Sequence, residues 1–172
     1  MLRGINLGST RRVPMAELRK LLGGAGYEDI RTYVQSGNVV LSSDADPAEL
    51  ERECAGLISE RFGFEVPVVV RTRDELAEVV ARDPLGEVAE DSKRYQVSFL
   101  AQELEPEIVK RLHALVVAPE ALVVDGREVY AWHPEGVARS KLWNGLASKS
   151  LGVTSTARNW TTVTTLLEMA DE

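Results

Sequence analysis

Apolar and polar positions follow two periods along this chain, and these periods predict a series of short strands and helices. In the first half, a helical stripe predicts one helix starting at Pro14 and ending at Gly23-Gly24, and a second one after an Asp46 cap. A Ser36-Gly37-Asn38 turn predicts a hairpin. The apolar runs typical of strands are residues 1–7, 30–35, 39–43 and 65–71. Their order, β-α-β-β-α-β, is that of a ferredoxin-like fold.

The order of elements partly repeats in the second half, after a connecting helix capped by Thr72 and Glu75 and a polar segment at residues 83–92. The expected elements are strands at 95–100, 121–124 and 129–132, and helices at 106–116, about 140–151 and from about 159 onward. We therefore predict an α+β protein of two ferredoxin-like subdomains. They span residues 1–88, including the connecting helix, and residues 89–172, including two C-terminal helices.

Composition narrows the class of protein. A formal net charge of −7 over 172 residues argues against broad, non-specific nucleic-acid binding, but it leaves room for a local basic patch. The single cysteine, Cys54, lies on a helical apolar stripe and is expected in the core. One cysteine allows no intramolecular disulfide, no apolar run reaches the roughly 20 residues of a membrane helix, and the start does not resemble a secretory signal. A cytoplasmic location without membrane attachment is the expectation.

The topology of a ferredoxin-like half brings several polar residues to one edge of its sheet. The loop after the first strand, the start of the first helix and the tip of the hairpin all lie at that edge. Main-chain N–H groups, arginines and amides there favour binding of an anion. The candidate ligand-binding residues are Arg3, Asn6, Arg11, Gln35, Ser36 and Asn38, with Ser9, Thr10 and Arg12 beside them. The alternative is a solvated loop and a tight turn, with Arg3 in a structural salt bridge.

A second group of hydrogen-bond donors occupies residues 154–160. Asn159 or Thr156 is expected to cap the last helix, while Arg158 and Trp160 either anchor that helix or stack on a ligand. Arg158 and Asn159 complete the candidate ligand-binding set. With only two histidines and one cysteine, no metal site is expected, and no motif identifies catalytic residues or a cofactor.

Several motifs give the chain a family resemblance. They are Leu2-Arg3-Gly4-Ile5-Asn6, Val13-Pro14-Met15-Ala16-Glu17-Leu18-Arg19, the stretch from Thr32 to Val40, and Thr156-Ala157-Arg158-Asn159-Trp160. In these motifs the chain resembles domain-of-unknown-function family 1697, a bacterial family. The resemblance implies a two-part α+β fold and no established activity, cofactor or catalytic residue. Relatives usually have further strand residues before the first motif, so either the natural start lies upstream of Met1 or the first strand is short.

Three functional hypotheses follow from the sequence. The first is a binding module for a phosphate-bearing ligand, such as an anionic small molecule, a nucleotide or a nucleic-acid end, with nucleic acid left open as a partner. The second is a structural or protein-interaction role, in which the motif residues bond internally. The third is an enzyme acting on a small metabolite, and the sequence does not decide whether the protein is an enzyme. It does not fix the oligomeric state either.

Overall fold

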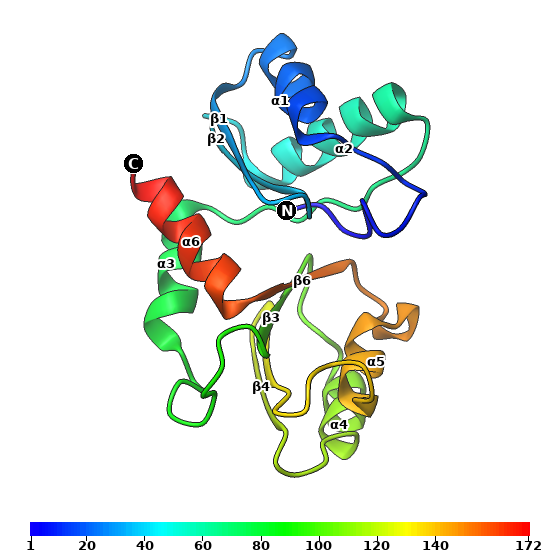
Figure 1. Cartoon of the computed structure of the whole chain (residues 1–172), viewed down its shortest axis with the longest axis vertical. Coiled ribbons are helices and arrows are strands. Elements are labelled where there is room, and N and C mark those ends of the chain that lie inside the picture. Colours follow the sequence, from blue (N-terminus) through cyan, green and yellow to red (C-terminus); the bar gives the residue numbers. More distant parts are fainter. The chain divides into compact units, whose positions relative to one another are not determined.

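The computed structural model describes residues 1–172, and they form an α+β protein with two antiparallel sheets (Figure 1). Contacts divide the chain into two compact units. The first unit comprises residues 1–75 and 165–172, and the second comprises residues 76–164. No helix combines the length and the apolar character that a membrane crossing requires.

The first unit contains a two-stranded sheet and two helices. Helix α1 (Met15–Gly24) precedes the hairpin of β1 (Glu28–Tyr33) and β2 (Asn38–Ser42), and α2 (Pro47–Phe62) follows. The predicted Asp46 cap is present, because its Oδ1 accepts the N–H of Ala48 at 2.9 Å. Helix α3 (Arg73–Arg82) begins at the predicted cap, in which Thr72 N–H donates to Glu75 and Glu75 N–H donates back to Thr72 Oγ1.

Two predicted strands of the first unit, residues 1–7 and 65–71, are absent, and this corrects the prediction. They meet at one isolated bridge between Leu2 and Val68. The backbone leaves the extended region at Gly4 (φ 67°) and again at Asn6 (φ 54°), and these turns prevent the opening segment from continuing as a strand. On the other side, Pro67 has no N–H to donate to a sheet.

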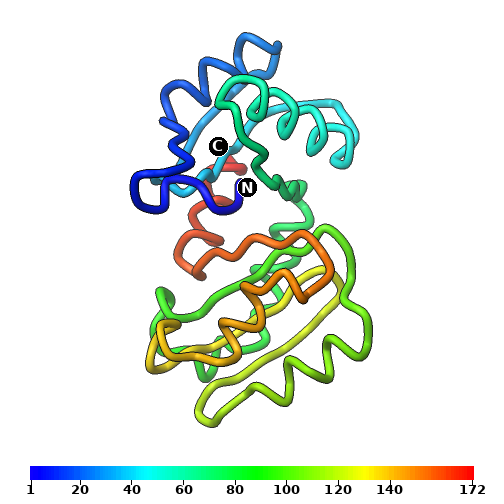
Figure 2. The backbone as a smooth tube through the Cα atoms, turned by 90° about the vertical axis from the view of Figure 1, so that its right-hand side faces the viewer, coloured from blue at the N-terminus to red at the C-terminus, as the bar shows by residue number.

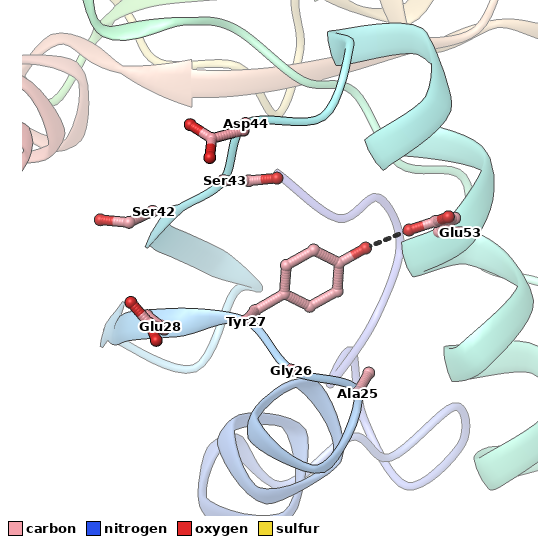
Figure 3. Close-up of a pocket in the computed structure, with 8 residues that line it drawn as sticks. All are labelled: Ala25, Gly26, Tyr27, Glu28, Ser42, Ser43, Asp44 and Glu53. Carbon is pink, nitrogen blue, oxygen red and sulfur yellow. Dashed lines mark hydrogen bonds between the residues drawn. The ribbon is translucent and has the colours of Figure 1, made fainter.

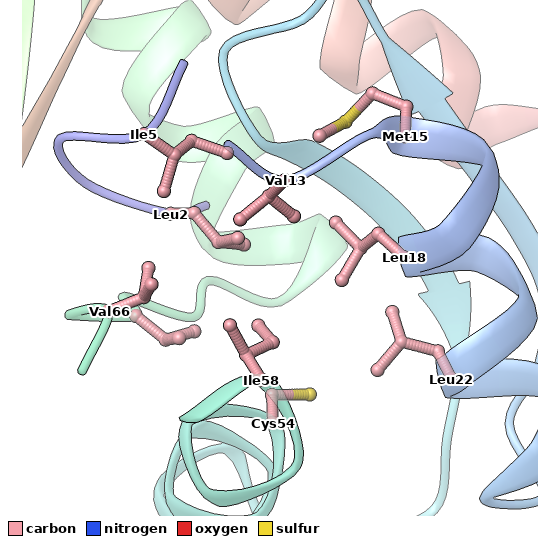
Figure 4. Close-up of a cluster of buried hydrophobic side chains, with 10 residues drawn as sticks. Leu2, Ile5, Val13, Met15, Leu18, Leu22, Cys54, Ile58 and Val66 are labelled. Carbon is pink, nitrogen blue, oxygen red and sulfur yellow. The ribbon is translucent and has the colours of Figure 1, made fainter. Parts of the chain in front are cut away.

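Buried apolar side chains from the opening segment, α1, α2 and the segment after α2 form the core of the first unit. Figure 4 shows Ile58 of α2 pointing toward Val13 and Leu18, and the sulfur of Cys54 pointing toward Leu22. Cys54 is only 7% exposed, so its expected place in the core is confirmed, and burial raises the pKa of its thiol. This core also holds the start of α1 in place, because Val13 and Met15, which flank Pro14, are both buried in it.

The second unit is a four-stranded antiparallel sheet with the order β4-β5-β3-β6. Its strands are β3 (Tyr95–Leu100), β4 (Ala121–Asp125), β5 (Glu128–Trp132) and β6 (Ser155–Asn159). Helices α4 (Pro106–Ala114) and α5 (Lys141–Ala147) and the 3₁₀ turn η1 (Lys149–Leu151) pack on one face (Figure 2). The last helix, α6 (Trp160–Asp171), begins directly after β6, and Trp160 stacks on Tyr95 at 4.7 Å between ring centroids.

Two further predictions for the second unit are corrected. The helix predicted at about 140–151 ends at Ala147, and a separate 3₁₀ turn follows because Ser148 accepts the N–H of Ser150 and starts a new turn. Residues 155–159, expected as a capping segment, form the edge strand β6 and pair with β3. Its polar residues Thr156 and Arg158 are buried on the sheet, which periodicity of apolar residues does not reveal.

Candidate functional site

Asn6 stands at the centre of the loop that opens the chain. Its Oδ1 accepts the N–H of Val13 at 2.8 Å, and its Nδ2 donates to the carbonyl of Val13 at 2.9 Å. The same Nδ2 donates to the carbonyl of Gln35 at 2.7 Å. Asn6 therefore closes the loop and attaches it to the hairpin, and most of its hydrogen-bonding capacity is used inside the protein.

Arg11 folds back over this loop. Its Nε donates to the carbonyl of Gly4 at 3.0 Å and its Nη2 to the carbonyl of Glu65 at 2.5 Å, while the guanidinium lies 5.0 Å from the ring centroid of Phe64. These contacts link the loop to the segment after α2. Arg11 is thus a brace of the loop, and its charge stays next to the loop backbone.

The hairpin turn meets the opening segment at Gly37. Its carbonyl accepts the N–H of Leu2 at 2.9 Å. Asn38 next to it is fully buried, and its Nδ2 donates to the carbonyl of Tyr33 and to Ser36 Oγ. The side chains of Gln35 and Ser36 are exposed at this turn. The structure therefore brings Asn6, Arg11, Gln35, Ser36 and Asn38 into one neighbourhood.

The remaining polar residues of the loop face solvent. Ser9, Thr10 and Arg12 are exposed, whereas Arg3 is half-buried and its backbone N–H donates to the carbonyl of Pro67 at 2.9 Å. Of the residues that the sequence favoured, Arg11, Gln35 and Ser36 are exposed as well, whereas Asn6 is half-buried and Asn38 is buried. The sequence signal for an internal role is asparagine itself. Its side-chain amide both accepts and donates hydrogen bonds, so it can join two segments of backbone.

Arg158 and Asn159 belong to the second unit, in β6. Arg158 is 9% exposed, and its Nη1 donates to Thr156 Oγ1 and to the carbonyl of Ala157, both at 2.7 Å. Burial lowers the pKa of Arg158 to about 10, so the guanidinium remains charged at neutral pH. Asn159 Oδ1 accepts the N–H of Thr162 at 2.9 Å, and this is the predicted cap of the last helix.

Replacing Asn159 with Ala is expected to lower the free energy of unfolding by about 1 kcal/mol, because the N–H of Thr162 loses its acceptor. Asn159→Asp keeps an acceptor oxygen at the same place and serves as the matched variant, with a change of about 0.5 kcal/mol or less. Urea denaturation measures both. Equal losses in the two variants would show that the cap is not what Asn159 contributes.

A surface pocket of about 480 Å³ lies elsewhere in the first unit, between the end of α1, β1 and the start of α2. Figure 3 shows the ring of Tyr27 inside it, with the hydroxyl donating to Glu53 at 2.5 Å. This bond raises the pKa of Tyr27, so the phenol stays protonated. Glu28, Asp44 and Glu53 line the pocket and would repel a phosphate. No predicted site residue belongs to it.

Sequence analysis missed a buried network in the second unit. Glu120 accepts from Ser140 Oγ, and its Oε1 lies 3.0 Å from Nδ1 of the fully buried His133. Burial opposes ionisation of Glu120, but hydrogen bonds from Ser140, His133 and the backbone N–H of Val117 outweigh it and lower the pKa of the carboxyl. His133 and Ser140 lie 13 and 20 positions from Glu120, and no motif joins the three residues.

Comparisons with known proteins agree with this fold. The profile of a family described as proteins of unknown function, DUF1697, matches residues 1–130. A structure of a conserved bacterial protein from Streptococcus pneumoniae is similar with a TM-score of 0.76 and 21% sequence identity, covering 99% of this chain and 96% of the other. No curated protein matches the sequence. Since the family profile covers most of the chain, and the chain carries the motifs that resemble it, this protein belongs to the DUF1697 family of proteins of unknown function.

Proposed function

We propose that this protein binds a phosphate-bearing ligand, a nucleotide or a nucleic-acid end, at the loop from Gly4 to Arg12. The observation that carries the proposal is an alternation of backbone conformation. Gly4, Asn6 and Gly8 have φ values of 67°, 54° and 68°, and the residues between them have negative φ. Successive residues of alternating hand turn their N–H groups toward one side and form a concavity that attracts anions.

Charge and exposure support the same proposal. The backbone N–H groups of Gly8 and Ser9 make no hydrogen bond within the protein, and the hydroxyls of Ser9 and Thr10 are exposed beside them. Arg12 is exposed and Arg11 is held against the loop, so two guanidinium charges flank the N–H groups. Asn6 and Asn38 then hold the loop and the turn in place, and they do not contact the ligand.

Arg12→Ala tests the proposal. Thermal denaturation with AMP at about 100 times its Kd is expected to raise the Tm of the wild-type protein by about 5 to 10 °C. Adenosine, which lacks the phosphate, is expected to leave Tm unchanged. Loss of the Arg12 contact should weaken AMP binding about tenfold, because a hydrogen bond to a charged group is removed.

Arg52→Ala is the matched control, since Arg52 is an exposed arginine of α2 in the same unit. It should bind AMP like the wild-type protein. The proposal fails if AMP, 5′-phosphorylated oligonucleotides and inorganic phosphate give no shift. It also fails if the Arg12 and Arg52 variants respond alike.

A structural role is the second candidate, and the side-chain bonds of Asn6, Arg11 and Asn38 favour it. Under this hypothesis the motifs serve only to join the opening segment to the hairpin. The phosphate-binding experiment separates the two candidates, because a purely structural loop would show no ligand-dependent Tm. For the third hypothesis, an enzyme, no residue is assigned a catalytic role.

We also infer that the second unit is a ferredoxin-like subdomain. The support is its element order, β3-α4-β4-β5-α5-β6, together with the sheet order β4-β5-β3-β6, which places its first and last strands side by side in the antiparallel sense. The first unit has the same order of elements with its outer strands reduced to one bridge. The division into residues 1–88 and 89–172, and the cytoplasmic location, stay predictions from the sequence.

A further inference from the structure

Charge is distributed unevenly along this acidic chain. The 27 Asp and Glu residues all lie outside residues 136–167, although about five would be expected there at the average density of the chain. The same stretch contains Arg139, Lys141, Lys149 and Arg158. Arg158 is buried, whereas the other three are exposed. A local positive surface therefore exists on a protein of net charge −7.

The fold adds further positive charge to the same side of the second unit. Helices α4 and α5 pack together on one face of the sheet through Leu112, Leu142 and Leu146 (Figure 1). Arg111 of α4 donates from Nη2 to the carbonyl of Ser150 at 2.7 Å and to its Oγ at 3.1 Å, which joins α4 to η1. We call this surface the basic face; its cationic residues are Lys110, Arg111, Arg139, Lys141 and Lys149.

Cations outnumber the carboxylates on and beside the basic face. The exposed carboxylates there are Glu107, one turn before Lys110 and Arg111 on α4, Glu105 just before α4, and Glu135, four residues before Arg139. Glu120 hydrogen-bonds to Ser140 at the start of α5, but its charge is taken up in the buried network with His133. The exposed part of the surface therefore has a net positive charge, and no ion pair is formed by its lysines or by Arg139 and Arg111.

We propose that the basic face binds the phosphate backbone of a nucleic acid. Charge complementarity identifies a polyanion, and the exposed polar groups of Asn144 and Ser150 can donate to phosphate oxygens beside the cations. The leucines of α5 and η1 point inward and are at most 3% exposed. A helix that lies in a membrane surface needs large exposed apolar side chains on one face, and α5 has none.

The net charge of −7 determines how such a complex behaves. The rest of the protein repels a polyanion, so only the basic face makes contact and binding depends strongly on salt. Each phosphate contact is expected to contribute about 0.7 to 0.9 to the slope of log K against log salt concentration. Two lysines removed from the contact should therefore lower this slope by about 1.5.

Fluorescence anisotropy of the full chain with labelled 20-nucleotide RNA and DNA, at about 50 mM salt, tests the proposal. The double variant Lys141→Glu, Lys149→Glu should bind at least tenfold more weakly and with a smaller salt slope. The matched control is Lys20→Glu, Arg52→Glu, which changes the net charge equally on exposed residues of the first unit. Its affinity should stay within about threefold of wild type.

Each other outcome overturns the proposal. Equal weakening of the two double variants would mean that only net charge matters. No binding of RNA or DNA at low salt would exclude a nucleic-acid surface, and binding to phosphatidylserine vesicles without binding to oligonucleotides would identify a membrane surface instead. AMP binding at the Gly4–Arg12 loop should be the same in both double variants, so this proposal and the proposed function fail independently.

Discussion

Replacing Gly37 with Ala is expected to lower the free energy of unfolding by about 3 to 4 kcal/mol. Two effects add at this position. Gly37 has a φ of 80°, which costs an L-residue about 1 kcal/mol or more. A Cβ atom would also lie 2.6 Å from Leu2 Cβ and 2.9 Å from Ile5 Cδ1. Leu2 Cβ is attached directly to the backbone, so the opening segment itself would have to move.

Two other glycines separate these effects. Gly63 has nearly the same φ, 78°, but open space around its Cβ position, so Gly63→Ala should cost about 1 kcal/mol. Gly56 lies inside α2 in open space, and Gly56→Ala should stabilise the protein by about 0.5 to 1 kcal/mol. Urea denaturation of the three variants measures each term. If Gly37→Ala costs no more than Gly63→Ala, the close approach of the hairpin to the opening segment is not rigid.

The contact at Gly37 matters for function because it carries the candidate loop. The N–H of Leu2 donates to Gly37, and the amide of Asn6 donates to Gln35 two positions earlier. Variants that separate the hairpin from the opening segment should therefore weaken AMP binding as well as stability. Since Gly37 contacts no proposed ligand atom, such a loss would be a positioning effect of the fold.

The helices of this protein could be predicted from sequence because their signals are local. Cys54 and Ile58 lie one helical turn apart and are both buried, and Asp46 caps their helix as expected. The opening segment was wrongly predicted as a strand, although its two buried apolar residues, Leu2 and Ile5, are three positions apart. A strand places residues of one face two positions apart, so this spacing already disagrees with a regular strand.

The candidate site was predictable only at the level of topology. The order of the elements predicts that Asn6 lies close to the hairpin. In the structure, Asn6 donates a hydrogen bond to the carbonyl of Gln35 in that hairpin. The hydrogen-bond partners of the individual side chains could not be predicted from the sequence, because they depend on which carbonyls lie within reach after folding. Arg11, for example, donates to Glu65, which is 54 positions away. Ligand binding by these residues stays a proposal.

No sequence pattern indicated the buried network around Glu120. Removing the Glu120 carboxylate is expected to have the second large effect on the free energy of unfolding. An ionised carboxylate only accepts hydrogen bonds, so Nδ1 of His133 carries the proton that points at Glu120. Glu120→Ala would leave Ser140 Oγ, His133 Nδ1 and the N–H of Val117 without their acceptor. We expect a loss of about 3 kcal/mol in the free energy of unfolding, measured by urea denaturation at pH 7. Glu60→Ala, at an exposed site of α2, should change it by less than about 0.5 kcal/mol.

The pH dependence of this network has a definite sign. The pKa of Glu120 is lower in the folded protein than its ordinary value of 4.5, so the unfolded chain takes up its proton first as the pH falls. The stabilisation by the carboxylate is therefore complete above 4.5 and decreases as the pH falls through the folded pKa. Glu120→Gln, which cannot ionise, should differ most from wild type at pH 7, and the difference should shrink on acidification. A difference that is constant from neutral to acidic pH would mean that the charge on Glu120 does not hold His133 and Ser140 in place.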